Sequence, residues 1–162
     1  MPLKAFEWTY SCVRVHFGPS AEEALRNYLK GLTKVHIVSG RTAALASGAL
    51  KDVISMLNEL GIQYKHFNQV VPNPPSTLAE ALAADVRSFG SEAIIAIGGG
   101  SAIDTAKVAA AIVGSGGTAL DYLYGRRKAQ RCHPLYVINL THGTGSEVDR
   151  YANMTDVTTG DK

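Results

Sequence analysis

Three consecutive glycines and a serine, Gly98, Gly99, Gly100 and Ser101, are the residues of this sequence whose chemistry is easiest to interpret. Glycine has no Cβ, so the backbone here can turn sharply and come close to a bulky anion. Ser101 stands where a helix would begin, and its hydroxyl can cap free N–H groups or meet a phosphate oxygen. Three glycines alone are equally compatible with a tight turn that binds nothing.

The flanking residues predict the elements that position this turn. The apolar run 93–97 is typical of a strand buried on both faces of a parallel sheet. Residues 102–113 are almost all apolar or small, which predicts a largely buried helix. Unpaired N–H groups and the positive end of the helix dipole would then point at the turn, so the pattern predicts an anion site.

A second polar loop follows another short apolar run, 135–138. It is rich in hydroxyl groups and glycine, and its candidate binding residues are Thr141, His142, Thr144 and Ser146. Sheets of α/β proteins bind ligands at the carboxyl ends of their strands. We therefore expect this loop to lie beside the loop 98–101.

The remaining pattern alternates strands with helices. Strands are predicted at 35–38, 62–67, 93–97 and 135–138, and helices at about 43–60, 78–89 and 102–113. This order predicts an α/β fold: a three-layer, Rossmann-like domain with a parallel sheet, in which 35–38, 93–97 and 135–138 are interior strands. Residues 6–17 predict a hairpin or edge strands, and capping boxes are expected at Ser20/Glu23 and Thr77/Glu80.

Two motifs carry a resemblance to a known family. Residues 98–107 match Gly-Gly-Gly-Ser-x-x-Asp-x-Ala-Lys without a break, and this is similar to the dinucleotide-binding signature of the iron-containing alcohol dehydrogenases. Residues 139–148 resemble the family's second signature, Pro-Thr-Thr-Ala-Gly-Thr-Gly-Ser-Glu-Val, from which Asn139, Leu140 and His142 depart. The resemblance implies a dehydroquinate synthase-like N-terminal domain, with residues 1–162 as one NAD(P)-binding domain.

The resemblance also implies which residues meet the cofactor. In the family the glycine turn wraps the cofactor diphosphate, an Asn between two prolines contacts the cofactor, and a Lys near the end of this region approaches it. His142 is interpreted as a hydrogen-bonding loop residue, with contact to nicotinamide or substrate as the alternative. The expected cofactor-binding residues are Gly40, Arg41, Asn73, Gly98, Gly99, Gly100, Ser101, Asp104, Thr141, His142, Thr144, Ser146 and Lys162.

The turn after residues 35–38 is expected to determine whether NAD or NADP binds more tightly. In the family an Asp there binds both ribose hydroxyls and selects NAD, and alignment places Gly40 at that position. Gly40 removes the negative charge, while Ser39 and Arg41 can contact a 2′-phosphate. The sequence therefore predicts NADP, with NAD as a possible second cofactor.

The family's reaction is metal-dependent hydride transfer between an alcohol and its aldehyde or ketone. In the family the metal is bound by one Asp and three His on a second, helical domain. The first two of these ligands form an Asp-x-x-x-His pattern, which this sequence lacks. We therefore predict no catalytic or metal-binding residue in this sequence. Iron or another divalent metal is expected only with the second domain, and this chain alone is expected not to turn over alcohols. The alternatives are a stand-alone or remnant dinucleotide-binding module without turnover, and a dehydroquinate synthase-like lyase fragment.

Composition excludes several other classes of protein. The 162 residues carry a net charge of +2 and are 46% hydrophobic and 19% charged, which gives no reason to expect nucleic acid or membrane partners. The two cysteines are expected to be free thiols, which together with the lack of a signal-peptide pattern predicts a cytoplasmic protein. A homo-oligomer is expected, because the missing domain should leave an apolar face.

Overall fold

The computed structural model describes residues 5–10 and 12–162. The chain divides into two compact units, Met1–Leu32 and Thr33–Lys162, and each is described by itself. The larger unit contains every residue expected to bind a cofactor.

The smaller unit is a hairpin followed by a helix. Strands β1 (Phe6–Tyr10) and β2 (Val13–Phe17) pair antiparallel, which confirms the predicted hairpin, and helix α1 spans Ala21–Leu29. The capping box predicted at Ser20 is wrong, because its side chain makes no cap hydrogen bond. Its φ of −82° and ψ of −6° are already helical, whereas a capping side chain needs an extended backbone.

The larger unit is built on a four-stranded parallel sheet in the order β4-β3-β5-β6. Its strands are β3 (Lys34–Gly40), β4 (Gln63–Val70), β5 (Ala93–Gly98) and β6 (Leu135–Asn139). Every residue of β5 is buried, and β3 is buried from residue 35 to 39, as the apolar runs predicted. On β4 exposed and less exposed residues largely alternate, as expected of an edge strand.

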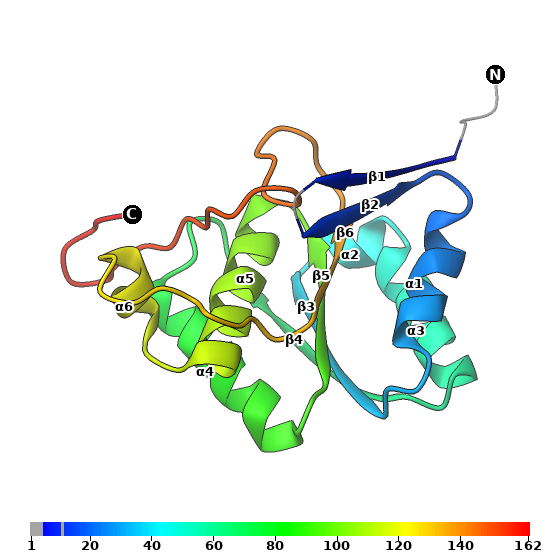
Figure 1. Cartoon of the computed structure of the whole chain (residues 1–162), viewed down its shortest axis with the longest axis horizontal. Coiled ribbons are helices and arrows are strands. Elements are labelled where there is room, and N and C mark those ends of the chain that lie inside the picture. Colours follow the sequence, from blue (N-terminus) through cyan, green and yellow to red (C-terminus); the bar gives the residue numbers. More distant parts are fainter. Residues whose placement is uncertain (1–4, 11) are drawn as a thin grey trace. The chain divides into compact units, whose positions relative to one another are not determined.

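Helices cover both faces of this sheet and complete the predicted three layers (Figure 1). Helices α2 (Ala43–Ala46) and α3 (Ala49–Glu59) lie on one face, and the predicted break between them is at Gly48. Helices α4 (Ser76–Phe89) and α5 (Gly100–Ser115) pack on each other over the opposite face, with the short α6 (Ala119–Leu123) beside them. Alanines on both α4 and α5 contribute to the core there, and small side chains let two helices approach closely.

Two local expectations in the larger unit are corrected. Strand β6 is an edge strand of the described sheet rather than an interior one, and its residues are only partly buried. The capping box predicted at Thr77 is also absent, because α4 begins at Ser76, two residues earlier than predicted, with Pro75 as its N-cap residue. Glu80 instead accepts a hydrogen bond from the N–H of Ala119 at 2.9 Å, which ties α4 to the start of α6.

A buried histidine, His36, anchors a polar cluster toward the amino end of the sheet. Its side chain is fully buried; Nδ1 lies 2.6 Å from the Ser91 hydroxyl and Nε2 lies 3.0 Å from Asp85. Lys65 completes the cluster through a 2.9 Å ion pair with Asp85. Burial lowers the pKa of His36 below its usual value even though Asp85 pulls that pKa upward, so His36 is neutral in the folded protein at neutral pH.

This burial predicts that the free energy of unfolding falls as the pH drops from about 7 to about 5. Burial also lowers the pKa values of His66 and His133. Unfolded histidines titrate near a pKa of about 6.5, so below that pH the unfolded chain binds protons that the folded chain does not. Each such proton adds a slope of up to about 1.4 kcal/mol per pH unit.

Urea unfolding at a series of pH values measures this slope. We expect His36→Gln to reduce it, whereas His142→Gln, at an exposed loop position, serves as the control and leaves it unchanged. A stability that does not change between pH about 7 and about 5 would contradict the neutral state of the buried histidines.

None of the helices that the structure describes is both long and apolar enough to cross a membrane. Cys12 and Cys132 form no disulfide in the structure, and both are exposed.

Candidate functional site

The glycine turn lies between the central strand and the longest helix. Strand β5 ends at Gly98, and α5 begins at Gly100 with Gly99 as its N-cap residue. No side chain caps this helix, so of the two expected roles of the Ser101 hydroxyl, capping is not observed. The N–H of Ala102 already donates to the carbonyl of Gly99 at 3.0 Å. By the geometry of a helix, the first-turn N–H groups that have no acceptor within α5 are therefore those of Gly100 and Ser101, and they point toward the carboxyl edge of the sheet.

The loop after β6 lies directly against this turn, as expected. The strands run in register to the Gly98–Asn139 pair, and the N–H of Leu140 donates to the carbonyl of Gly98 at 2.9 Å. A Cβ at Gly99 would lie only 2.3 Å from the Thr141 hydroxyl oxygen, and one at Gly100 only 2.9 Å from the Thr144 methyl carbon. The absence of two side chains therefore lets the loops 98–101 and 141–146 meet.

The turn after β3 ends at the same edge of the sheet, because parallel strands share the direction of their carboxyl ends. Gly40 is half-buried and Arg41 is exposed. Ser39, expected to reach a phosphate, is instead fully buried, and its hydroxyl lies 2.9 Å from the carbonyl of Gly40 and 2.8 Å from His66 Nε2. That expectation is wrong, because β3 is buried on both faces from residue 35 to 39 and the Ser39 hydroxyl already has partners within the protein.

Asn73 and Lys162, far apart in the sequence, meet near this edge. The ammonium of Lys162 donates to the side-chain oxygen of Asn73 at 2.8 Å. Asn73 has a φ of 50°, a conformation that Asn adopts more readily than most residues. Both are exposed, so both remain accessible to a ligand.

The tail that carries Lys162 is held by turns and one isolated bridge. A single parallel bridge joins Pro75 to Thr155. Beyond it, the hydroxyl and N–H of Thr158 and the hydroxyl of Tyr124 donate to Asp156, and these bonds lower the pKa of Asp156 to about 2. The charged Asp156 thus fixes the turn that leads to the last residue.

Asp104 and Ser146 lie deeper than the other expected residues. Asp104 is 5% exposed, and one of its carboxylate oxygens accepts a hydrogen bond from the N–H of Asn153 at 3.0 Å. Ser146 is 6% exposed, and its N–H donates to the Thr144 hydroxyl at 3.2 Å. Thr141, His142 and Thr144 are exposed in the same loop.

The model of one protein family matches this chain over residues 12–162, and its description is iron-containing alcohol dehydrogenase. The chain belongs to the iron-containing alcohol dehydrogenase family. The resemblance of the two loop motifs is thereby confirmed at the level of the family. Members of this family use a nicotinamide dinucleotide and a metal.

Curated relatives in this family are longer than the chain. It is 40% identical over 131 residues to the long-chain primary alcohol dehydrogenase AdhA of Thermoanaerobacter ethanolicus, covering 80% of this chain and 32% of that protein. It is 35% identical over 150 residues to the NADH-dependent butanol dehydrogenase B of Clostridium acetobutylicum, covering 92% and 38%. The chain thus spans about a third of the length of these iron-containing alcohol dehydrogenases.

Solved structures of the family agree with the fold. An iron-containing alcohol dehydrogenase from Thermotoga maritima superposes with a TM-score of 0.81 at 30% identity, over 94% of this chain and 43% of that one. A sulfoacetaldehyde reductase from Bifidobacterium kashiwanohense in complex with NAD+ also gives 0.81, at 28% identity, over 96% and 42%. The α/β fold predicted from the strand and helix pattern is therefore that of the N-terminal portion of the iron-containing alcohol dehydrogenases.

Sequence reasoning did not assign roles to two charged residues at this site, Lys107 and Asp149. Lys107 stands in the family signature and forms a 2.8 Å ion pair with Asp149. The available signal was the presence of two charges, at 104 and 107, on a helix that is otherwise apolar or small, since buried charges need partners. Within residues 5–10 and 12–162, no group of three or more His, Cys, Asp or Glu side chains could hold a metal ion.

Proposed function

We propose that this chain binds a nicotinamide dinucleotide at the carboxyl edge of its parallel sheet. The observation that carries the proposal is the meeting of the loops 98–101 and 141–146 at the first turn of α5. Free N–H groups, the helix dipole and the Ser101 hydroxyl all favour a diphosphate there. The absence of side chains at Gly99 and Gly100 lets Thr141 and Thr144 of the second loop lie against this turn.

The other expected residues fit around this anion site. Gly40 and Arg41 would face the adenosine ribose, and Asn73 and Lys162 offer an amide and an ammonium at the same edge. When bound, the nicotinamide exchanges a hydride with an alcohol carbon, and the family's metal acts as a Lewis acid on the alcohol oxygen. The residues of this chain bind and orient the dinucleotide, and we assign none of them to the metal or to a proton transfer.

We further propose that these residues form the cofactor-binding part of a metal-dependent oxidoreductase acting between an alcohol and its aldehyde or ketone. NADP is the proposed cofactor, and the chain by itself is proposed to bind it without turnover. The expected homo-oligomer and cytoplasmic location also remain proposals. For self-association, support comes from half-exposed aromatic side chains on the hairpin, at Phe6, Trp8 and Tyr10.

Titration calorimetry of the purified chain with NADPH, NADH and ATP tests the binding proposal. We expect both dinucleotides to bind and ATP to bind more weakly, and Ser101→Ala to lose about tenfold or more in dinucleotide affinity through one hydrogen bond to a charged group. Ser88→Ala, at the far end of α4, is the matched control, because its hydroxyl bonds only within the Asp85 turn. The proposal fails if neither dinucleotide binds, or if Ser88→Ala weakens binding as much as Ser101→Ala.

A further inference from the structure

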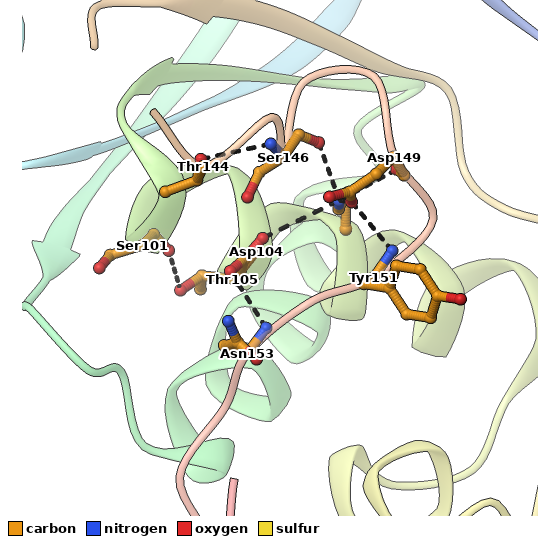
Figure 2. A network of polar contacts seen from close by, with 9 residues as sticks. Ser101, Asp104, Thr105, Thr144, Ser146, Asp149, Tyr151 and Asn153 are labelled. Atoms are coloured by element: carbon orange, nitrogen blue, oxygen red, sulfur yellow. Dashed lines mark hydrogen bonds and ion pairs between the residues drawn. The ribbon is translucent and has the colours of Figure 1, made fainter. Parts of the chain in front are cut away.

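Helix α5 carries two charged side chains just beyond its anion-facing first turn. Asp104 and Lys107 are three residues apart and so lie on one face of the helix, with side chains that are 7% and 17% exposed. Charges are rarely this buried unless hydrogen bonds or ion pairs compensate them. Apart from each other, these two side chains find their partners in residues 146–153, at and after the end of the loop 141–146 (Figure 2).

Lys107 uses all of its hydrogen-bonding capacity on that segment. Its ammonium donates to the carbonyl of Ser146 at 2.8 Å, to the carbonyl of Asp149 at 3.1 Å and to the carboxylate of Asp149 at 2.8 Å. An ammonium has three N–H donors, so these three acceptors satisfy it. Lys107 is therefore occupied by the protein and has no donor left for a phosphate.

Asp104 and Asp149 also accept hydrogen bonds from the backbone of the segment that Lys107 contacts. Asp104 accepts from the N–H of Asn153 at 3.0 Å, and its other oxygen lies 3.9 Å from the Lys107 nitrogen. Asp149 also accepts from the N–H of Tyr151 at 2.9 Å. Figure 2 shows how these contacts run between the helix and the segment that crosses it.

The attached segment has no regular structure of its own. Residues 144–153 contain turns and bends but no helix or strand, so few backbone hydrogen bonds define their path. Thr144 and Ser146 lie near the start of this segment. The Thr144 methyl group lies where a side chain at position 100 would otherwise be, beside Gly100. The positions of Thr144 and Ser146 thus depend on what holds residues 146–149.

We propose that Lys107 is a positioning residue for the dinucleotide: without touching the cofactor, it clamps the loop 144–149 onto α5 and so presents Thr144 and Ser146 to the binding edge. This inference rests on the proposed function. A loop that is ordered before the ligand arrives binds more tightly, because the entropy of ordering it is not lost on binding. Lys107→Met keeps an unbranched apolar side chain, one atom shorter, and removes all three bonds.

Calorimetry with NADPH and NADH and hydrogen–deuterium exchange of residues 144–150 test the clamp, at a temperature where circular dichroism shows every variant folded. For Lys107→Met we expect about a tenfold or greater loss of dinucleotide affinity and faster exchange in the loop. Lys107→Arg should recover part of both, and Asp149→Asn should lose less than Lys107→Met because both carbonyl acceptors remain. Lys65→Met is the control: it breaks a 2.9 Å ion pair on β4 in the same unit and should change neither measurement.

The outcomes separate this inference from the proposed function. Wild-type affinity in Lys107→Met, or unchanged exchange in its loop, would overturn the clamp. Equal losses in Lys107→Met and Lys65→Met would overturn it too, since they would show a general effect of stability. If the wild-type chain binds no dinucleotide, the proposed function fails, while faster loop exchange in Lys107→Met alone still supports the clamp.

Discussion

Gly99→Ala is expected to weaken dinucleotide binding by about tenfold to a hundredfold, or roughly 1.4 to 2.7 kcal/mol. The backbone of Gly99, with a φ of −98° and a ψ of −163°, is one that alanine adopts without strain. The added methyl group, however, would lie 2.3 Å from the Thr141 hydroxyl oxygen, and a Cβ contact that short forces one loop to move. The loss should therefore come from steric displacement of the two loops.

Thermal unfolding and calorimetry on three variants test this explanation. Gly99→Ala should lower both Tm and affinity. Adding Thr141→Gly removes the opposing side chain and with it the clash, so the double variant should recover Tm. Its affinity should stay low because Thr141 is itself an expected cofactor-binding residue. Ser88→Ala, whose hydroxyl bonds to Asp85 on α4, is the control and should not change affinity. An unchanged affinity in Gly99→Ala would contradict the placement of the diphosphate at this turn.

The central part of this site was predictable because its signals are local. Strand, turn and helix follow one another in a single stretch of chain. The apolar run 93–97 predicts the strand, the glycines predict the turn, and the apolar stretch after them predicts the helix. The second loop follows by the same logic, since a parallel neighbour of β5 must end at the same edge. The contact between the loops then needs only the absence of side chains at Gly99 and Gly100.

The expectations that failed depend on partners distant in the sequence or on fine backbone angles. The apolar run of β6 is consistent with an interior or an edge strand, and only the pairing order decides between them. Ser20 has a capping side chain but helical backbone angles. Lys107 finds Asp149 across 42 positions, and no periodicity within α5 indicates that partner.

The turn after β3 is expected to make NADP bind more tightly than NAD, by about tenfold, which corresponds to about 1.4 kcal/mol. In the family an Asp at the position of Gly40 binds the ribose hydroxyls and would repel a 2′-phosphate. Since the structure buries Ser39, the preference rests on the missing carboxylate at Gly40 and on the exposed Arg41. A charge-assisted hydrogen bond from Arg41 contributes about 1.5 to 3 kcal/mol, enough for such a preference.

Gly40→Asp should reverse this preference, with NADP losing about tenfold or more in affinity and NAD gaining hydrogen bonds to its ribose. The backbone permits the change, because Gly40 is not among the glycines with a positive φ and a Cβ there meets only the Val70 carbonyl oxygen. Gly40→Asn has the same size without the charge, so it separates repulsion from crowding, and Arg41→Gln should weaken NADP alone. Calorimetry with both cofactors decides the matter: equal affinities in the wild type, or unchanged NADP binding in Gly40→Asp, would show that the adenosine ribose lies elsewhere.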